Sequence, residues 1–83
     1  MSAELVSGKI RDAFPGSTVL IEDISDSCGY KYSVVVVTDE FDGKTLIQRH
    51  RAVNTVLAEE MKIIHALAIK AYTQEQYAKQ QSA

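Results

Sequence analysis

The chain has 83 residues, the length of one small domain spanning 1–83, with nine Lys and Arg against 11 Asp and Glu and a formal net charge of −2 at pH 7. Nucleic-acid binders usually carry a basic excess, because contacts to phosphate supply much of their affinity, so this balance speaks against that class. One cysteine excludes an internal disulfide, and no apolar run approaches the roughly 20 residues that cross a membrane.

The first half of the chain predicts a helix and two strands. Apolar residues at helical spacing indicate a helix over 2–14, which Ser2 caps and Pro15 and Gly16 end. Strands are predicted over 17–23 and 30–38, joined by a loop rich in Asp and Ser. The run Val34–Val37 has no polar face, which predicts a central strand covered on both sides.

The second half predicts a helix, a strand and a short final helix. The helix spans about 45–61, with a buried stripe formed by Leu46, Val53, Leu57 and Met61. An apolar strand follows over 63–72. Thr73 and Gln76 then have the spacing of a capping box, which predicts a helix through Tyr77 and a frayed tail over 79–83.

The order of these elements predicts the topology. The first two strands are expected to form an antiparallel hairpin, and the helical crossover makes the second and third strands parallel neighbours. The expected fold is therefore α+β, in the order helix, strand, strand, helix, strand, helix, with helices packed on a mixed three-stranded sheet.

Parallel pairing has a consequence for Cys28 and His65. Cys28 precedes the second strand and His65 begins the third, and parallel neighbours start at the same edge of a sheet about 4.8 Å apart. A thiolate and an imidazole that converge in this way are a candidate metal-ligand pair. The competing interpretation is a small buried cysteine and a hydrogen-bonded histidine, although the polar loop around Cys28 favours an accessible thiol.

Two ligands do not complete a metal site, because structural zinc and two-iron clusters both take four. A second molecule is expected to supply the rest, and a homodimer that contributes two residues from each chain stays open. A Cys–His hydrolase is the enzymatic alternative, but the sequence contains no assembled motif for a third residue or an oxyanion hole.

The second predicted helix has its charges in an order that its dipole does not favour. Cations lie near its start and acids near its end, namely Lys44, Arg49, Arg51, Glu59 and Glu60. These cations either face an anionic partner or form a solvated surface. His50 points to the apolar stripe and is interpreted first as a structural histidine with a hydrogen-bonded ring, with a ligand role as the minority alternative.

One segment resembles a known family. The residues Phe41–Asn54 read FDGKTLIQRHRAVN and are similar to the signature of BolA-like proteins, approximately Phe-x-Gly-Lys-x-Leu-x-x-Arg-His-Arg-x-Val-Asn. The segments 57–60, 64–67 and 70–73, with Gln76 and Tyr77, continue the likeness over essentially the whole chain. Family members resemble type II K-homology domains in fold, and this chain is most similar to the cytosolic and nuclear eukaryotic subgroup.

The resemblance implies a function and a site. Members of that subgroup pair with monothiol glutaredoxins of the Cys-Gly-Phe-Ser type and bridge a two-iron, two-sulfur (2Fe-2S) cluster. The family histidine corresponds to His65 and the loop cysteine to Cys28, while the glutaredoxin cysteine and glutathione supply the other ligands. The implied role is non-enzymatic, in iron-status regulation or cluster trafficking. Location in the cytoplasm or nucleus is expected, because the first residues show no secretory or transit pattern.

Nucleic-acid binding is the alternative function, since some bacterial members of the family are regarded as transcriptional regulators. The sequence departs from that model, because its glycines at 8, 16, 29 and 43 form no Gly-x-x-Gly loop. The helix that carries Arg49 and Arg51 is the candidate surface for this alternative.

Overall fold

Three helices, a three-stranded sheet and two short 3-10 turns make up the computed structural model, which describes residues 2–81. In chain order they are α1 (Ala3–Ala13), β1 (Thr18–Asp23), β2 (Tyr30–Val37), η1 (Asp39–Phe41), α2 (Leu46–Val56), η2 (Glu60–Lys62), β3 (Ile64–Tyr72) and α3 (Gln74–Gln81). The predicted α+β class and element order are confirmed. Within residues 2–81, none of the helices is long and apolar enough to span a membrane.

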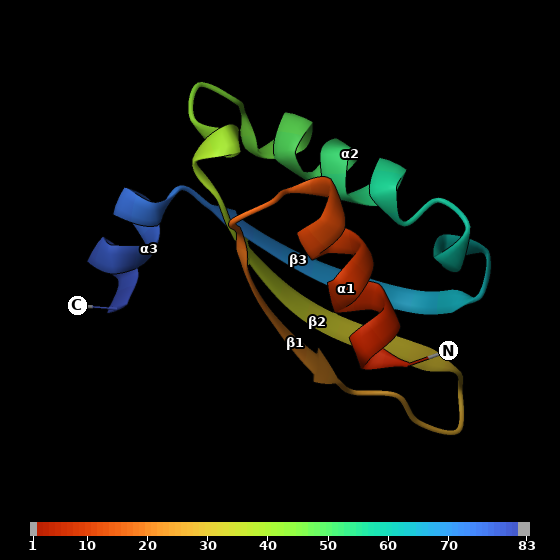
Figure 1. Cartoon of the computed structure of the whole chain (residues 1–83). Helices are drawn as coiled ribbons and strands as arrows, with labels where there is room; N and C mark the ends of the chain where they lie inside the picture. Colours follow the sequence, from red (N-terminus) through yellow and green to blue (C-terminus); the bar gives the residue numbers. More distant parts are fainter. Residues whose placement is uncertain (1, 82–83) are drawn as a thin grey trace.

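The sheet has the predicted topology. Its strand order is β1-β2-β3, with β1 antiparallel and β3 parallel to the central strand β2. Figure 1 shows α1 and α2 on the same side of the sheet, while α3 lies beyond the end at which β2 and β3 finish. The hairpin that joins β1 to β2 and the start of β3 lie at the opposite end (Figure 1). The sheet therefore presents two ends with different surroundings.

The core lies between the two long helices and one face of the sheet. Side chains of β2 alternate, so that Tyr32, Val34 and Val36 are buried beneath α1 and α2, while Val35 on the opposite face is partly exposed. The prediction that β2 is covered on both sides is therefore wrong for most of the strand, and only at its end is Val37, on the same face as Val35, also buried. Val35 faces away from the helices, and a β-branched side chain suits a pleated surface even where burial is partial.

Helix α2 begins as predicted but ends before the predicted Met61. Thr45 and Gln48 form a reciprocal capping box, in which each side chain accepts a hydrogen bond from the other residue's backbone amide. Leu57 follows the helix, is fully buried and has a non-helical backbone. The chain then turns through η2 into β3.

Two glutamates that the sequence placed at the end of this helix lie beyond it. Glu60 forms an ion pair with Lys9 of α1, with 2.9 Å between Nζ and Oε1, and Glu59 pairs with Lys62. The ion pair with Lys9 joins the turn after α2 to α1. These two acids therefore do not oppose the helix dipole in the way that the sequence suggested, whereas Lys44 and Arg49 do lie at its start.

Helix α3 is longer than predicted. The capping box is confirmed, because Thr73 and Gln76 exchange backbone-to-side-chain hydrogen bonds of 3.0 and 3.3 Å. The helix continues past Tyr77 to Gln81, so residues 79–81 are helical and not a frayed tail; residues 82 and 83 lie outside the described residues. An ion pair between Glu75 and Lys79, one helical turn apart, favours the extension.

Arg49 ties α2 to β3 and α3. Only 6% of its surface is exposed, and its Nε donates to the carbonyl of Lys44 at 3.0 Å. Its Nη1 donates to the Ala71 carbonyl at 3.2 Å and to Gln76 Oε1 at 2.7 Å. The guanidinium also lies over the ring of Phe41, 5.8 Å from its centroid. The prediction that Arg49 belongs to an exposed cationic surface is therefore corrected, because these contacts hold it inside the fold.

Replacing Arg49 with lysine should lower the free energy of unfolding by about 2 kcal/mol, because a single ammonium cannot make all of these contacts. Arg51→Lys is the matched control, since Arg51 is an exposed neighbour in the same helix, and should change stability by less than about 0.5 kcal/mol. Urea unfolding of both variants measures the difference. Equal midpoints for the two variants would contradict the structural role of Arg49.

Candidate metal-ligand site

Cys28 lies at the tip of a tight hairpin turn. The ladder between β1 and β2 continues past β1, and Asp26 and Gly29 donate backbone hydrogen bonds to each other's carbonyls at 3.2 and 3.1 Å. Ser27 and Cys28 are the two residues between them. The turn holds the thiol outside the fold, and Cys28 is exposed, as the composition of the loop predicted.

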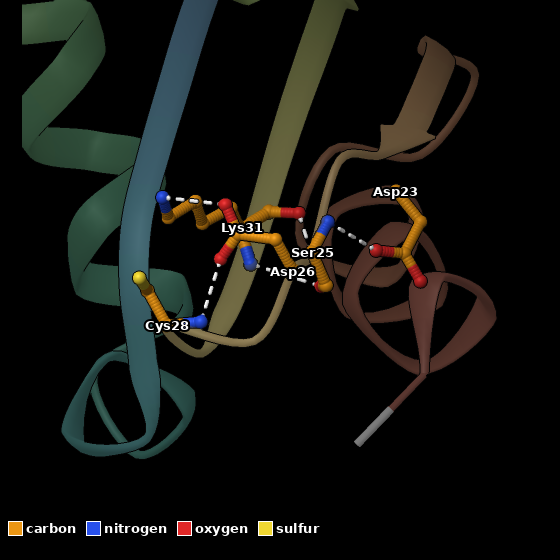
Figure 2. A network of polar contacts seen from close by, with 5 residues as sticks. All are labelled: Asp23, Ser25, Asp26, Cys28 and Lys31. Atoms are coloured by element: carbon orange, nitrogen blue, oxygen red, sulfur yellow. Dashed lines mark hydrogen bonds and ion pairs between the residues drawn. The ribbon is translucent and has the colours of Figure 1, made fainter.

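A carboxylate fixes the backbone of this turn. Asp26 Oδ1 accepts the amide hydrogen of Cys28 at 2.8 Å, and Asp26 Oδ2 pairs with Lys31 Nζ at 3.0 Å (Figure 2). The hydrogen bond from Lys31, followed by that from the Cys28 amide, lowers the pKa of Asp26 below its usual value. Because Asp26 is fully charged near neutral pH, it holds the amide of the cysteine in one orientation.

A second polar contact closes the base of the hairpin. The hydroxyl of Ser25 accepts the amide hydrogen of Lys31 at 3.0 Å, and the carboxylate of Asp23 accepts that of Ser25 at 2.9 Å (Figure 2). The contacts from Ser25 also lower the pKa of Asp23. The six-residue loop is therefore an ordered extension of the sheet, built from residues that the sequence identified only as polar.

His65 occupies an irregularity in the third strand. The pairing of β2 with β3 shifts between Tyr30, opposite Ile64, and Lys31, opposite Ala66, so His65 has no partner in the register. Such a bulge inserts one unpaired residue and re-aims its side chain. Regular alternation with Leu67 and Ile69 would place residue 65 on the core side, whereas the extra residue places Ile64 in the core and leaves His65 exposed.

The bulge brings His65 against the turn that carries Cys28. A Cβ placed on Gly29 would lie 3.1 Å from the Cβ of His65, so the backbone beside the cysteine directly contacts the histidine. In Figure 2 the sulfur of Cys28 is drawn beside the ribbon of β3, in agreement with this contact. The predicted convergence of the two segments is confirmed, whereas metal binding by Cys28 and His65 stays a prediction. Residues 2–81 contain no cluster of three or more His, Cys, Asp or Glu suited to a metal.

The remaining candidate residues lie elsewhere. Lys44 and Arg51 are exposed near and within α2, which leaves their predicted contact with an anionic partner open. The ring of His50 is partly buried and makes no hydrogen bond to any residue in 2–81, so the expected hydrogen-bonded ring is wrong. Its ring lies in a hollow between α2 and β3 and does not join His65.

Comparison with known proteins gives sequence relatives of one kind. A family model for BolA-like proteins matches residues 10–76. The chain is 55% identical over 56 residues to Protein BOLA2 of Arabidopsis thaliana, covering 66% of this chain and 60% of that protein. It is 43% identical over 61 residues to BolA-like protein 2 of Saccharomyces cerevisiae, covering 74% and 51%. The chain therefore matches about half the length of the yeast relative.

Other relatives are matched along nearly their whole length. BolA-like protein 2 of Homo sapiens is 40% identical over 81 residues, which covers 96% of this chain and 94% of that protein. A solved Bol-like protein from Babesia bovis superposes with a TM-score of 0.91 at 30% identity, covering 98% and 94% of the two chains. Yeast Fra2 gives a TM-score of 0.74 at 36% identity, covering 95% and 86%.

Gly29→Ala should destabilise the chain by about 1–3 kcal/mol, because its φ of +137° is strained for any side chain and its new methyl would press on His65. Gly8→Ala is the matched control. Gly8 lies inside α1 with open space around it, so alanine there should raise stability by about 0.5–1 kcal/mol. Thermal unfolding distinguishes the two signs, and a neutral or stabilising Gly29→Ala would refute the close approach.

The hydrogen bond between Asp26 and the Cys28 amide should depend on pH. Because the pKa of Asp26 is lowered, the bond is intact at neutral pH and is lost as the pH falls through that lowered value. The amide chemical shift of Cys28 should therefore titrate with a midpoint below that of an ordinary aspartate. Asp26→Asn should abolish the titration, and a midpoint at or above the ordinary value would contradict the contacts described.

Proposed function

The chain belongs to the BolA-like protein family, and from this premise we propose that it is a non-enzymatic partner of a monothiol glutaredoxin of the Cys-Gly-Phe-Ser type, with which it shares a bridging 2Fe-2S cluster. The observation that carries the proposal is the contact between Gly29 and His65, which joins the exposed thiol turn to an exposed imidazole. The role in the cell is iron-status regulation or the trafficking of clusters.

The side chains of Cys28 and His65 offer the kinds of atom that bind a 2Fe-2S cluster. Thiolate sulfur and imidazole nitrogen are the side-chain atoms that hold 2Fe-2S clusters in proteins. Cys28 and His65 are two of the four ligands that a cluster requires, so the others have to come from outside this chain. The glutaredoxin cysteine and glutathione are the proposed donors. When bound, the cluster supplies one-electron chemistry or serves as cargo.

The residues around the two ligands have positioning roles. The bulge frees His65 from the alternation of β3, so the imidazole can face outward without removing an apolar residue from the core. Asp26 is paired with Lys31 and accepts the Cys28 amide hydrogen, which fixes the backbone that carries the thiol. A ligand pair held on ordered backbone loses less conformational entropy on binding than one on a flexible loop.

Mixed ligation also suits the proposed role. Histidine ligation in place of thiolate raises the reduction potential of a two-iron cluster. As a ligand, an imidazole is protonated or displaced more readily than a thiolate. This would favour release of the cluster to an acceptor. A homodimer with two ligands from each chain is the competing assembly, and it would need no glutaredoxin.

The decisive experiment mixes the full chain with a Cys-Gly-Phe-Ser glutaredoxin, glutathione, ferrous iron and sulfide, and records visible absorption and circular dichroism. A spectrum distinct from that of the glutaredoxin homodimer is expected. Cys28→Ala and His65→Ala should each change it, because each removes a ligand, and His65→Cys should restore a cluster with a shifted spectrum.

Ser27→Ala is the matched control for the cysteine variant. Ser27 is the exposed neighbour of Cys28 in the same turn, and its replacement should leave the spectrum unchanged. A spectrum that is only that of the glutaredoxin homodimer would rule out cluster sharing. A cluster that forms with this chain alone would favour the homodimer.

A further inference from the structure

A hollow runs along the junction of α2, β3 and α3, at the end of the sheet opposite to Cys28. Its larger part, about 450 Å³, lies between the start of α2, the end of β3 and α3. A second part of about 260 Å³ continues along α2 and β3 and shares Leu46, Ala71 and Tyr72 with the first. We name the two parts together the α2–β3–α3 groove. Its size is that of an ordinary ligand or peptide pocket.

The groove has an apolar floor that the fold leaves open. Leu46, which the periodicity of the helix placed in the buried stripe, is 64% exposed, and its neighbour Ile47 is exposed to the same extent. Ile69, Ala71 and the ring of Tyr72 complete the apolar lining. Exposed large aliphatic side chains beside a hollow mark a surface that gains from being covered.

The charges that line the groove are all of one sign. The lining includes Arg49 and Lys70, together with Lys79, which is paired with Glu75, and it contains no carboxylate, although acids outnumber bases in the chain as a whole. Helix α2 also begins here, so its first backbone amides add positive potential at the same place. The electrostatic field in the groove therefore favours an anion.

Arg49 gives the strongest indication. Its guanidinium is buried, yet among residues 2–81 no carboxylate pairs with it, and its hydrogen bonds go to two carbonyls and an amide oxygen. Only Nε and Nη1 are used, which leaves Nη2 without an acceptor in the described part of the chain. Nη2 is not among the fully buried polar atoms without a partner, and Arg49 is one of the residues that line the groove. Buried charges in proteins are normally paired, and this one lacks its counter-ion.

We propose that the α2–β3–α3 groove binds an acidic peptide segment of another protein, whose carboxylate pairs with Arg49 while an apolar side chain covers Leu46. A carboxylate oxygen can accept a hydrogen bond from Nη2, the guanidinium nitrogen that the fold leaves unused, and its charge is opposite to that of Arg49. An apolar side chain gains from the aliphatic floor, which a phosphate backbone does not. The net negative charge of the chain also favours a peptide over a nucleic acid.

This surface is separate from the cluster site. The groove lies where β2 and β3 end, and the turn with Cys28 lies where they begin (Figure 1). A peptide bound in the groove therefore leaves the candidate ligands open. The inference goes beyond the proposed function, and its test uses no iron, sulfide or glutaredoxin, so that either can fail while the other stands.

The test titrates the ¹⁵N-labelled full chain with a short peptide in which leucines are flanked by aspartates and glutamates. Amide shifts are expected at Leu46, His50, Tyr72 and Gln76 and not in the turn at 26–29. The same peptide with lysine in place of each acid, and a single-stranded polyuridine, serve as comparison ligands. Salt should weaken the binding of the acidic peptide.

Two pairs of variants separate charge from apolar contact. Lys70→Glu should weaken binding about fivefold or more, whereas Arg11→Glu, which makes the same change of net charge on the exposed surface of α1, should not. Leu46→Ser should weaken binding about tenfold, whereas Ile63→Ser, at an exposed apolar residue near the other end of the sheet, should not. The labelled spectra report at the same time whether each variant is folded.

Each other outcome overturns the proposal. Equal binding of the lysine peptide would remove the role of charge, and shifts outside the groove would remove the site. Binding of polyuridine in the groove without binding of the acidic peptide would assign the surface to nucleic acid. Absence of shifts with all three ligands would show that the groove is not a docking surface for an acidic peptide.

Discussion

The parallel pairing of β2 with β3 is the constraint on which the structure depends. It joins two segments that a whole helix and its connections separate in the chain, and it makes β2 the centre of the sheet. The one-residue shift at its start then decides where the nearby side chains go. Ile64 enters the core, His65 turns outward, and the turn after β1 comes to rest against it. Core and candidate site are therefore set by the same few backbone hydrogen bonds.

At the other end of the sheet, Arg49 holds separate segments of the chain together. A single guanidinium holds the carbonyl before α2, a carbonyl of β3 and the amide of Gln76 in α3. A guanidinium has five N–H donors in a planar fork. These three hydrogen bonds use Nε and Nη1, so Nη2 has no acceptor among residues 2–81. The residue that holds these three segments together thus places beside the groove a positive charge that no carboxylate among residues 2–81 pairs with.

Much of this fold could be predicted from the sequence, because the strongest signals are local. Caps at Ser2 and Thr73, and the apolar spacing along the chain, indicated the elements, and the crossover predicted the parallel pair. The capping box of Thr45 with Gln48 was found only in the structure. The shift at His65 could not be predicted, because Ile63 and Ile64 are both apolar and periodicity does not distinguish a bulge from a regular strand.

The errors in the second helix have a similar cause. The segment after its end is held by an ion pair between Lys9 and Glu60, two residues far apart in the chain, which a local pattern does not report. The exposure of Leu46 depends on where α3 packs, which helical spacing does not report. Arg49 was identified as a candidate for anion binding from its charge and position, but only the structure shows that it reaches inward. Charge patterns along a helix do not give the direction of a long side chain.

The separation of Cys28 and His65 along the chain has a consequence for how the protein is made. A nascent or unfolded chain does not hold the thiol and the imidazole together, since bringing them close requires the whole sheet, including its long-range parallel strands. Such non-local pairings are slow to form, because loop-closure entropy has to be overcome first. The two side chains can therefore act together as a chelate only in the folded chain. An unfolded or partly folded chain would not hold the ligand pair.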